Sequence, residues 1–581
     1  MEMSLKTYEE AIDLVDIIRI GQLDYDSKLE LAKNQKDLFY EAINVAYQAY
    51  GMTGDRRYLE MAFNMTEKGK AGMLYDFIRE SDAKHYANIP DSLLEKERKV
   101  KEEITLYENL VYQELQVVSS QRDSAKIALW NEKLFRLRDQ QKEIVDYFNV
   151  NYPKYYEYKY NNRIYSLGEV QQYLTKKDVL LEYFTGREAM FVFEITRDAV
   201  RIRKQALDPR LFADLENLPN NQTLDAITND AYPTFANYLS SSYDLYRALL
   251  QPFEQDLQGR DLIIIPDGKL GYVSFESLLT KHVEMHEVDY RNLPYLINDH
   301  AVSYGYSTTL LVNSRSKVHE GKARENLVAF APVVFNTSNY ATAVQQERSL
   351  RSRLRDEKLL DLPGTKQEVL DITRIVGGDV YLNDQATVTK FKEIASRYKI
   401  LHIATHGIVD DNDPLHSRLM FSPSTSNIDG GCLQYNDLFN LELNADLAVL
   451  SACNTGAGRN SEGEGIIALS RGFLYSGVPS LVISLWKVED EATATIMKNF
   501  YKYLKQGKTK DEALRLSKLE YLHTTDPTGA SPYYWSSFVN IGNKDPLHFN
   551  RSGLNYLWLL LILLPLPACL FHLRRKNSHR I

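Results

Sequence analysis

Three apolar runs between Lys399 and Asp490 constrain the fold of this 581-residue chain more than any other feature. They read KILHIATHG, ADLAVLSACNTGAG and PSLVISLWKVED, and each run stops abruptly at polar or glycine-containing residues. The segments between them are long enough to hold a crossover helix. Short apolar runs spaced in this way are typical of neighbouring parallel strands that are buried on both faces. The sequence therefore predicts an α/β fold.

Two of these predicted strands end at side chains that are suited to nucleophilic catalysis. The run 400–404 is followed by His406, and the run 447–450 is followed by Cys453. Because sites in open parallel sheets form outside the carboxyl ends of the strands, we expect both side chains to face one crevice. An imidazole raises the thiolate fraction of a neighbouring thiol and can later protonate a leaving amine.

The glycine that follows His406 suggests how such a site stabilises charge. Gly407 lets the backbone approach a substrate closely, and the amides of Gly407 and Cys453 are candidates for an oxyanion hole. The competing interpretation is that Cys453 is a buried and inert thiol. His402 lies inside its run, where a core hydrogen bond is expected. Four residues along a strand span roughly 13 Å, so His402 and His406 cannot chelate one ion, and we predict neither a metal nor a cofactor.

Four motifs carry a resemblance to a known family. HIATHG, LSACNTG, EGIIALSRGFLYSGVPSLVISLWKV and the upstream LIIIPDGKLGYVSFESLL resemble the CHAT family, relatives of caspases and separases, over residues 165–542. The resemblance implies a caspase-like three-layer sandwich, with a mostly parallel sheet and helices on both faces. It also implies a protease dyad, which on this chain is Cys453 as nucleophile and His406 as base.

A specificity residue is suggested by the stretch that follows the third run. WKVED, which ends at Asp490, resembles the Trp-x-Val-x-Asp pattern of separases, whose pocket selects arginine. We therefore expect Asp490 to favour a basic residue before the scissile bond, because a desolvated acid pairs bidentately with a guanidinium. Glu489 in that role, or a simple helix cap, are the competing interpretations. Residues 456–465 lack a Gly-Lys-Ser/Thr sequence and are predicted to form a loop beside the nucleophile, without a phosphate site.

The resemblance and the residue patterns together suggest a domain organisation. Residues 1–90 are predicted to be helical, with two amphipathic segments at 38–50 and 58–75, and the resemblance implies a tetratricopeptide-like repeat. Heptad spacing in 91–155 predicts a long, coiled-coil-like helical hairpin that braces the next domain, or alternatively a partner-docking arm. Residues 156–325 would be a caspase-like pseudodomain without chemistry, and 326–545 the catalytic half.

Composition excludes some functions and leaves others open. The formal net charge of -9 gives no general basic character, so nucleic-acid binding is not expected. The three cysteines, Cys432, Cys453 and Cys569, do not form a disulfide framework, and we interpret Cys432 as structural.

An apolar stretch near the end of the sequence predicts a membrane anchor. The residues between Leu554 and Leu573 are almost wholly apolar over about 20 positions, and the basic tail 574–581 follows them. We expect a single transmembrane helix. The basic tail favours the cytoplasmic side, whereas no signal peptide is visible to export the body. A C-terminal anchor with a cytoplasmic body is therefore the expectation, and a periplasmic or otherwise extracytoplasmic body is the alternative.

These expectations combine into one functional hypothesis. The chain would be a membrane-anchored cysteine endopeptidase that cleaves protein substrates, with the helical front end regulating it or recruiting an activating protein partner. One competing class is a non-catalytic scaffold that uses the caspase-like body only for binding. Another is a thiol-dependent transferase, which shares the dyad and differs in what attacks the acyl-enzyme.

Overall fold

The computed structural model describes most of residues 1–549 of the chain. The stretches outside the described residues are 23–24, 87–88, 116, 118, 161–162, 221–223, 317–324, 336–359, 411–412, 424–430, 453–457, 462–463, 488 and 550–581. Every helix and strand named below belongs to Met1–Leu547, which form one unit.

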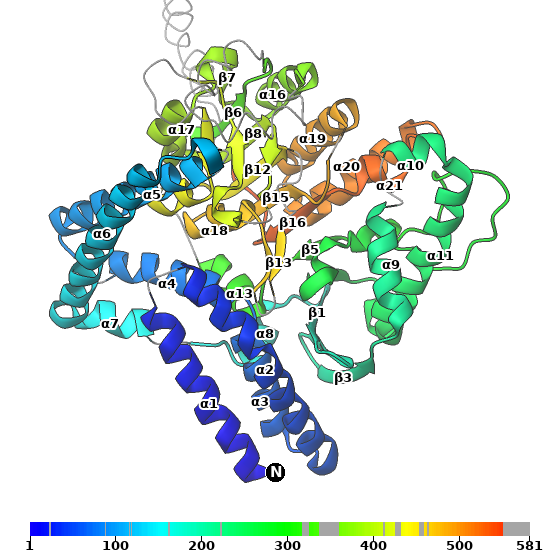
Figure 1. The fold of residues 1–581 in the computed structure, drawn as a ribbon. Coiled ribbons are helices and arrows are strands. Elements are labelled where there is room, and N and C mark those ends of the chain that lie inside the picture. Colours follow the sequence, from blue (N-terminus) through cyan, green and yellow to red (C-terminus); the bar gives the residue numbers. More distant parts are fainter. Residues whose placement is uncertain are drawn as a thin grey trace, which may run out of the picture. The chain divides into compact units, whose positions relative to one another are not determined.

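The N-terminal region consists of packed helices (Figure 1). They are α1 (Glu2–Gly21), α2 (Tyr25–Thr53), α3 (Arg56–Lys68) and α4 (Gly72–Tyr86). The alanines at 42, 46, 49 and 62 are fully buried, which allows α2 and α3 to pack closely. The predicted helical segment 58–75 is wrong as one helix, because the chain breaks between α3 and α4. A Cβ atom on Gly69 would lie 2.9 Å from the Phe39 ring. The backbone at Gly69 therefore lies too close to Phe39 to leave room for a side chain.

A long helical hairpin follows. It consists of α5 (Asp91–Leu115) and α6 (Ser124–Asn151), and α7 (Pro153–Tyr160) returns the chain to α4. Asp123 caps α6 by accepting hydrogen bonds from two backbone amides of its first turn. The apolar positions of the heptads form a small core of their own, which includes Val100, Ile104, Leu134, Leu137, Ile144 and Phe148. Besides α6, α5 contacts the segment that follows the predicted catalytic histidine.

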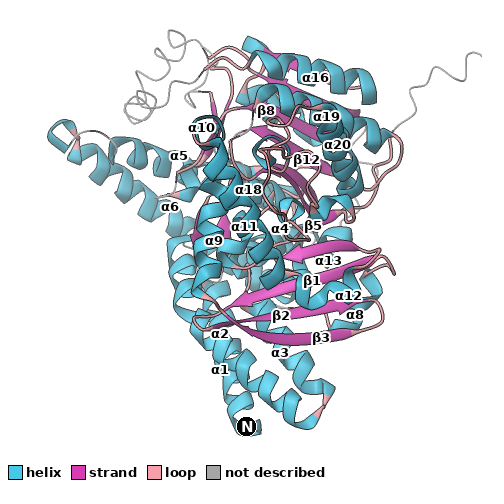
Figure 2. Ribbon diagram, turned by 90° about the vertical axis from the view of Figure 1, so that its right-hand side faces the viewer, coloured by secondary structure: helices cyan, strands magenta, loops and turns pink. Residues whose placement is uncertain are grey.

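One continuous sheet forms the centre of the remaining chain (Figure 2). Its strands, in spatial order, are β3 (Val200–Ala206), β2 (Ala189–Thr196), β1 (Asp178–Thr185), β4 (Asp261–Ile265), β5 (Val302–Tyr304), β16 (Phe538–Gly542), β15 (Ser480–Ser484), β12 (Leu447–Ala452), β8 (Tyr398–Thr405), β6 (Glu325–Ala331) and β7 (Asp379–Leu382). The three apolar runs of the sequence are β8, β12 and β15, which are neighbours and parallel.

The sheet has two halves that run in opposite directions. Strands β7, β6, β8, β12 and β15 are parallel to one another, and β16, β5, β4 and β1 are parallel to one another. The two sets meet at the antiparallel pair β15–β16. The carboxyl ends of the strands in the two halves therefore lie at opposite edges of the sheet.

Helices cover both faces of the sheet. In the later half, α16 (Pro363–Val376) and α19 (Asp490–Lys505) lie on one face, and α17 (Val388–Ile394) and α18 (Ser470–Tyr475) on the other. In the earlier half, aromatic side chains of α2 and α3 pack on β2, and α11 (Ala231–Leu249) packs on the opposite face. The other helices are α8 (Leu167–Tyr173), α9 (Pro209–Asn220), α10 (Leu224–Asn229), α12 (Glu254–Leu257), α13 (Thr308–Ser316), α20 (Lys510–Thr524) and α21 (Pro532–Trp535).

Two small sheets extend the loops at the carboxyl ends of β8 and β12. Strands β9 (Gly407–Ile408), β10 (Arg418–Met420) and β11 (Cys432–Gln434) form an antiparallel sheet directly after β8. Strands β13 (Arg459–Ser461) and β14 (Gly465–Ile467) form a hairpin after β12. The predicted loop 456–465 thus contains part of a β-hairpin. Cys432 is buried beside Met420, in agreement with a structural role.

The prediction of a membrane-spanning helix is corrected. The α/β body and the helical region in front of it agree with the sequence, but no helix among the described residues is both long and apolar enough to cross a bilayer. The longest of these helices, α2 and α6, have sufficient length, yet charged residues occur along both. The predicted span, 554–573, lies outside the described residues. We therefore withdraw the transmembrane helix from the fold class, and the single-pass localisation with it.

The junction between the two halves of the sheet yields a stability prediction. Gly542 ends β16 at φ 88°, and a Cβ atom there would lie 2.4 Å from the backbone oxygen of Pro479. Gly507 has a similar φ of 81°, with nothing within 4 Å of the added atom. We expect Gly507→Ala to cost about 1 kcal/mol through backbone strain alone. Gly542→Ala should cost roughly 3 kcal/mol, because the Pro479 backbone must also move.

Denaturant unfolding of the two variants beside the wild type measures this difference. Because both glycines have left-handed φ values, the comparison isolates the steric term. Equal losses of stability in the two variants would contradict the prediction.

Candidate active site

The register of two neighbouring strands positions the predicted dyad. Strands β8 and β12 are parallel, and Thr405 at the end of β8 is paired with Ala452 at the end of β12. In the sequence, His406 and Cys453 are the residues that directly follow this pair of strand ends. Cys453 itself lies outside the described residues, as does its amide in the predicted oxyanion hole.

The His406 imidazole is held by one hydrogen bond and one ring contact. Its Nε2 atom lies 2.8 Å from the carbonyl oxygen of Leu360. A carbonyl only accepts, so Nε2 carries the proton and Nδ1 keeps the lone pair that a general base needs. The buried ring of Phe335 contacts the imidazole edge-on, with 4.6 Å between ring centroids. These contacts fix both the tautomer and the orientation of His406.

Leu360 is a site residue that the sequence did not reveal. Its contribution is a backbone carbonyl, which any residue type supplies, so no motif marks it. The nearest signal is the start of α16 shortly after it, where Pro363 occupies the first helical turn.

Gly407 presents a backbone amide that the small sheet does not use. Gly407 is paired with Leu419 of β10, and the neighbouring Met420 amide donates to the His406 carbonyl at 2.9 Å. This pattern makes Gly407 and Leu419 a non-hydrogen-bonded pair, so the N–H of Gly407 points away from β10. Such an orientation is the one required of an oxyanion-hole donor on this strand.

His402 belongs to the core, as its place within the apolar run indicates. The imidazole is fully buried, with Nδ1 3.1 Å from the Tyr501 hydroxyl and Nε2 3.0 Å from a Glu368 carboxylate oxygen. The expected core hydrogen bond of His402 is confirmed.

Asp490 lies at the first position of α19, near the end of β15 and hence at the same edge of the sheet as His406. The helix cap is the preceding residue, Glu489, whose carboxylate accepts the Ala492 amide at 2.8 Å. Glu489 is therefore the residue that caps α19, and the Asp490 carboxylate does not take part in the cap. Among the described residues, no donor or cation lies within hydrogen-bond or ion-pair distance of the Asp490 carboxylate.

The surroundings of Asp490 favour its neutral form. Burial raises the pKa of this half-buried carboxyl, and the negative charges of Glu489 and Glu368 raise it further, against the opposing effect of Lys487. The start of α16 approaches closely, because a Cβ atom on Gly364 would lie 2.8 Å from the Asp490 Cβ. A carboxyl group with no cation in ion-pair distance among the described residues is suited to receive a cationic ligand.

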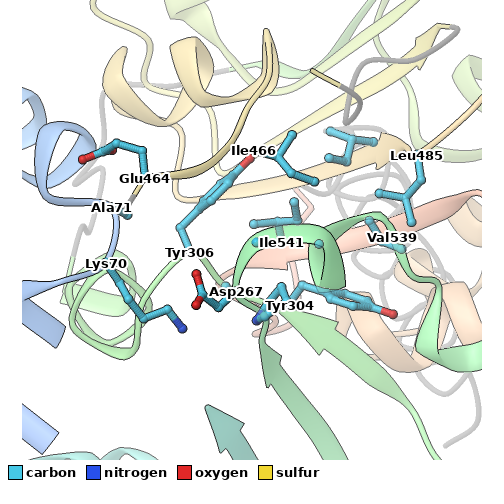
Figure 3. Close-up of a pocket in the computed structure, with 15 residues that line it drawn as sticks. Lys70, Ala71, Asp267, Tyr304, Tyr306, Glu464, Ile466, Leu485, Val539 and Ile541 are labelled. Carbon is cyan, nitrogen blue, oxygen red and sulfur yellow. The ribbon is translucent and has the colours of Figure 1, made fainter. Parts of the chain in front are cut away.

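A separate pocket, drawn in Figure 3, lies on the face of the sheet opposite to His402. Ile483 of β15 lines it and shares a face with Leu450 and Ile403, whereas His402 points to the opposite face. Each charged side chain of the pocket has a partner: Lys70 pairs with Glu182, Asp267 with Lys36 and Glu464 with Arg471. The pocket is therefore distinct from the dyad.

Comparison with known proteins agrees with the motifs. The chain matches the model of the CHAT domain over residues 240–543, which is more than half of its length. Tetratricopeptide repeat protein 28 from Mus musculus is 22% identical over an alignment 382 positions long, which covers 58% of this chain and 15% of the relative. The Homo sapiens protein of the same name is 23% identical with the same coverage. The chain thus spans about one seventh of the length of these relatives.

Solved structures give weaker similarities. The separase–securin complex of Saccharomyces cerevisiae at 3.0 Å aligns with 90% of this chain and 37% of its own, at 9% identity and a TM-score of 0.45. The arginine-specific cysteine proteinase gingipain R aligns with 58% of this chain and 75% of its own, at 8% identity and a TM-score of 0.30. Scores below 0.5 say nothing about activity. On the CHAT-domain match, the chain belongs to the CHAT-domain family, with a helical region in front of a caspase-like α/β body.

Proposed function

We propose that the chain is a cysteine endopeptidase that uses Cys453 and His406 to cleave protein substrates. The observation that supports the proposal is the pairing of Thr405 with Ala452, the residues that precede His406 and Cys453 in the sequence, together with the contact between the Leu360 carbonyl and Nε2 of His406. Membership of a family related to caspases and separases supports the same chemistry.

The proposed reaction follows from these groups. Nδ1 of His406 takes the thiol proton of Cys453, and the thiolate attacks the carbonyl carbon of the scissile bond. The amides of Gly407 and Cys453 donate to the oxyanion that forms. His406 then gives its proton to the leaving amine, and water attacks the acyl-enzyme to release the acid and the free thiol.

The proposed substrate preference is a basic residue before the scissile bond. A guanidinium that enters beside Asp490 finds a carboxylate without a cation, and Glu368 adds a second negative charge close by. Pairing with the guanidinium replaces the water that Asp490 loses through burial. We also propose that the helical region regulates the site or recruits protein partners.

The first prediction tests the nucleophile. Intact-mass analysis of the full chain after treatment with an arginyl peptide chloromethyl ketone should show one adduct. The adduct should be absent from Cys453→Ala, because the thiol is the attacking group. His406→Ala should slow its formation by about 10²–10⁴-fold, the usual contribution of a general base.

A surface histidine provides the matched control for this experiment. His523 is exposed on α20, and His523→Gln should react at the wild-type rate. Absence of an adduct on the wild type would contradict the peptidase proposal and favour a non-catalytic scaffold. If an adduct forms, and a peptide ester substrate in a separate assay passes its acyl group to added amines in preference to water, the chain is a transferase.

The second prediction concerns Asp490. Asp490→Asn should reduce the kcat/KM of arginyl peptides, relative to norleucyl peptides, on the order of 100-fold, because a charged hydrogen bond of about 2–3 kcal/mol is lost. Glu491→Gln, an exposed neighbour in the same helical turn, should retain the preference. A peptide library that shows no preference for arginine or lysine on the wild type would refute the pocket.

A pH profile gives a third, independent prediction. Because burial and the neighbouring acids raise the pKa of Asp490, its carboxyl takes up a proton at a higher pH than an ordinary aspartate does. The neutral form cannot form an ion pair with a guanidinium, so the arginine preference in kcat/KM should be full only above this raised pKa. It should then fall as the pH drops through this raised pKa. A preference that persists to the pKa of an exposed aspartate would show that Asp490 does not set it.

A further inference from the structure

The loop that follows Cys453 is attached to the N-terminal helical region through Glu464. One carboxylate oxygen of Glu464 accepts the backbone amide of Met73, in the first turn of α4, at 2.8 Å. The other accepts the Arg471 guanidinium at 2.8 Å. Glu464 is 3% exposed, so both interactions are shielded from water. Figure 3 shows Glu464 beside Ala71, at the start of α4.

Glu464 belongs to a hairpin with a short connection to the nucleophile. Strands β13 and β14 pair from Arg459 to Ile467, and Glu464 lies in the turn between them. On its other side the hairpin is held by Tyr272, whose hydroxyl donates to the carbonyl of Gly458, the first described residue after Cys453. The hairpin therefore joins the Cys453 loop to α4 through fixed contacts.

The segment that follows His406 is attached to the same helical region, at α5. The Tyr112 hydroxyl donates to the Asp410 carboxylate, and the Tyr112 ring stacks on His416 with 3.6 Å between centroids. Asn109, one turn earlier on α5, accepts a hydrogen bond from Asn436 at 3.0 Å. Both Asp410 and His416 are buried under this helix. The hairpin helix α5 thus packs on the later half of the chain, residues 326–545, whereas the sequence analysis expected it to brace the domain that directly follows it, residues 156–325.

The two helices that make these contacts are themselves joined by buried charges. Lys84 of α4 lies 2.6 Å from the Glu97 carboxylate of α5, and Lys101 lies 3.3 Å from the same group. Burial tends to raise the pKa of Glu97, yet Lys101 and Lys84 outweigh it and hold the pKa below its ordinary value. A displacement of one helix would break the Lys84–Glu97 pair between α4 and α5, although Lys84 would keep Glu80 and Glu97 would keep Lys101 on their own helices. The buried pair therefore opposes a separation of α4 from α5.

We propose that Glu464 and Asp410 are positioning residues of the peptidase site, and that α4 and α5 form the fixed base to which both loops are attached. This inference rests on the proposed function. It makes the helical region part of the site, because the loop after the nucleophile and the loop after the base have their anchors there. Since a shift of about 1 Å at reacting groups can cost 10²-fold in rate, loosening either anchor should slow the reaction without touching the dyad.

Two reagents on the full chain separate positioning from reactivity. Modification of Cys453 by an arginyl chloromethyl ketone requires an aligned dyad and oxyanion hole. Iodoacetamide, used at a pH above the ordinary thiol pKa of about 8.5, requires only a reachable thiol, because ionisation there does not depend on His406. Glu464→Gln, Tyr112→Phe and Asp410→Asn should each lower the chloromethyl ketone rate about 10-fold or more, with the iodoacetamide rate close to that of the wild type.

A double-mutant cycle makes the test specific to the α5 contact. Tyr112→Phe combined with Asp410→Asn should slow the chloromethyl ketone by less than the product of the two single effects, because the two changes share the Tyr112–Asp410 hydrogen bond. Tyr147→Phe, at an exposed tyrosine on α6, should have no effect. If Glu464→Gln does not fold, Tyr112→Phe, which removes a single hydroxyl, still tests the anchor.

The outcomes distinguish the two proposals. A wild type that Cys453-directed chloromethyl ketone does not modify would overturn the proposed function and this inference with it. A wild type that is modified, with unchanged rates in all three anchor variants, would overturn the inference alone. Equal slowing with both reagents would also overturn it, because the variants would then have altered thiol exposure in place of alignment.

Discussion

The hydrogen-bonded register between β8 and β12 is the constraint on which the rest of the structure depends. Both strands are buried on both faces, so their backbone groups must pair with one another, and a slip of one residue would turn each apolar side chain to the wrong face. With Thr405 opposite Ala452, the register determines where strands β8 and β12 end relative to each other. The chemistry at the sheet edge is thus positioned by packing that lies several residues away from it.

The sequence predicted the features that follow from apolar periodicity and from the residues at strand ends. The apolar runs become β8, β12 and β15, and His406 is at the strand end where the pattern places it. The Leu360 carbonyl was not predictable, because a backbone acceptor carries no residue signature. The role of Glu464 was missed for a related reason. Its partner, the Met73 amide, is far away in the chain, and a single sequence records no contact of that kind.

Local pattern also failed where long-range context decides. The segment 58–75 has helical periodicity throughout, but the packing of Gly69 against Phe39 breaks it. The apolar residues between Leu554 and Leu573 matched the composition of a membrane span. Composition alone does not establish a helix, and the described helices that have sufficient length bear charges. For Asp490, the sequence suggested the acid, whereas its separation from the capping role of Glu489 required the structure.

The two halves of the sheet run in opposite directions and differ in how they are connected to the region around His406. Strands β1, β4 and β5 end at the edge of the sheet away from His406. Strand β2 runs the other way, but β1, β4, β5 and β16 separate it from β15. The contribution of the earlier half is the platform on which α2 and α3 pack. Those helices continue into α4 and α5, which contact the loops after Cys453 and His406. The earlier half of the sheet is therefore connected to the segments around His406 and Glu464 through the helices that pack on it.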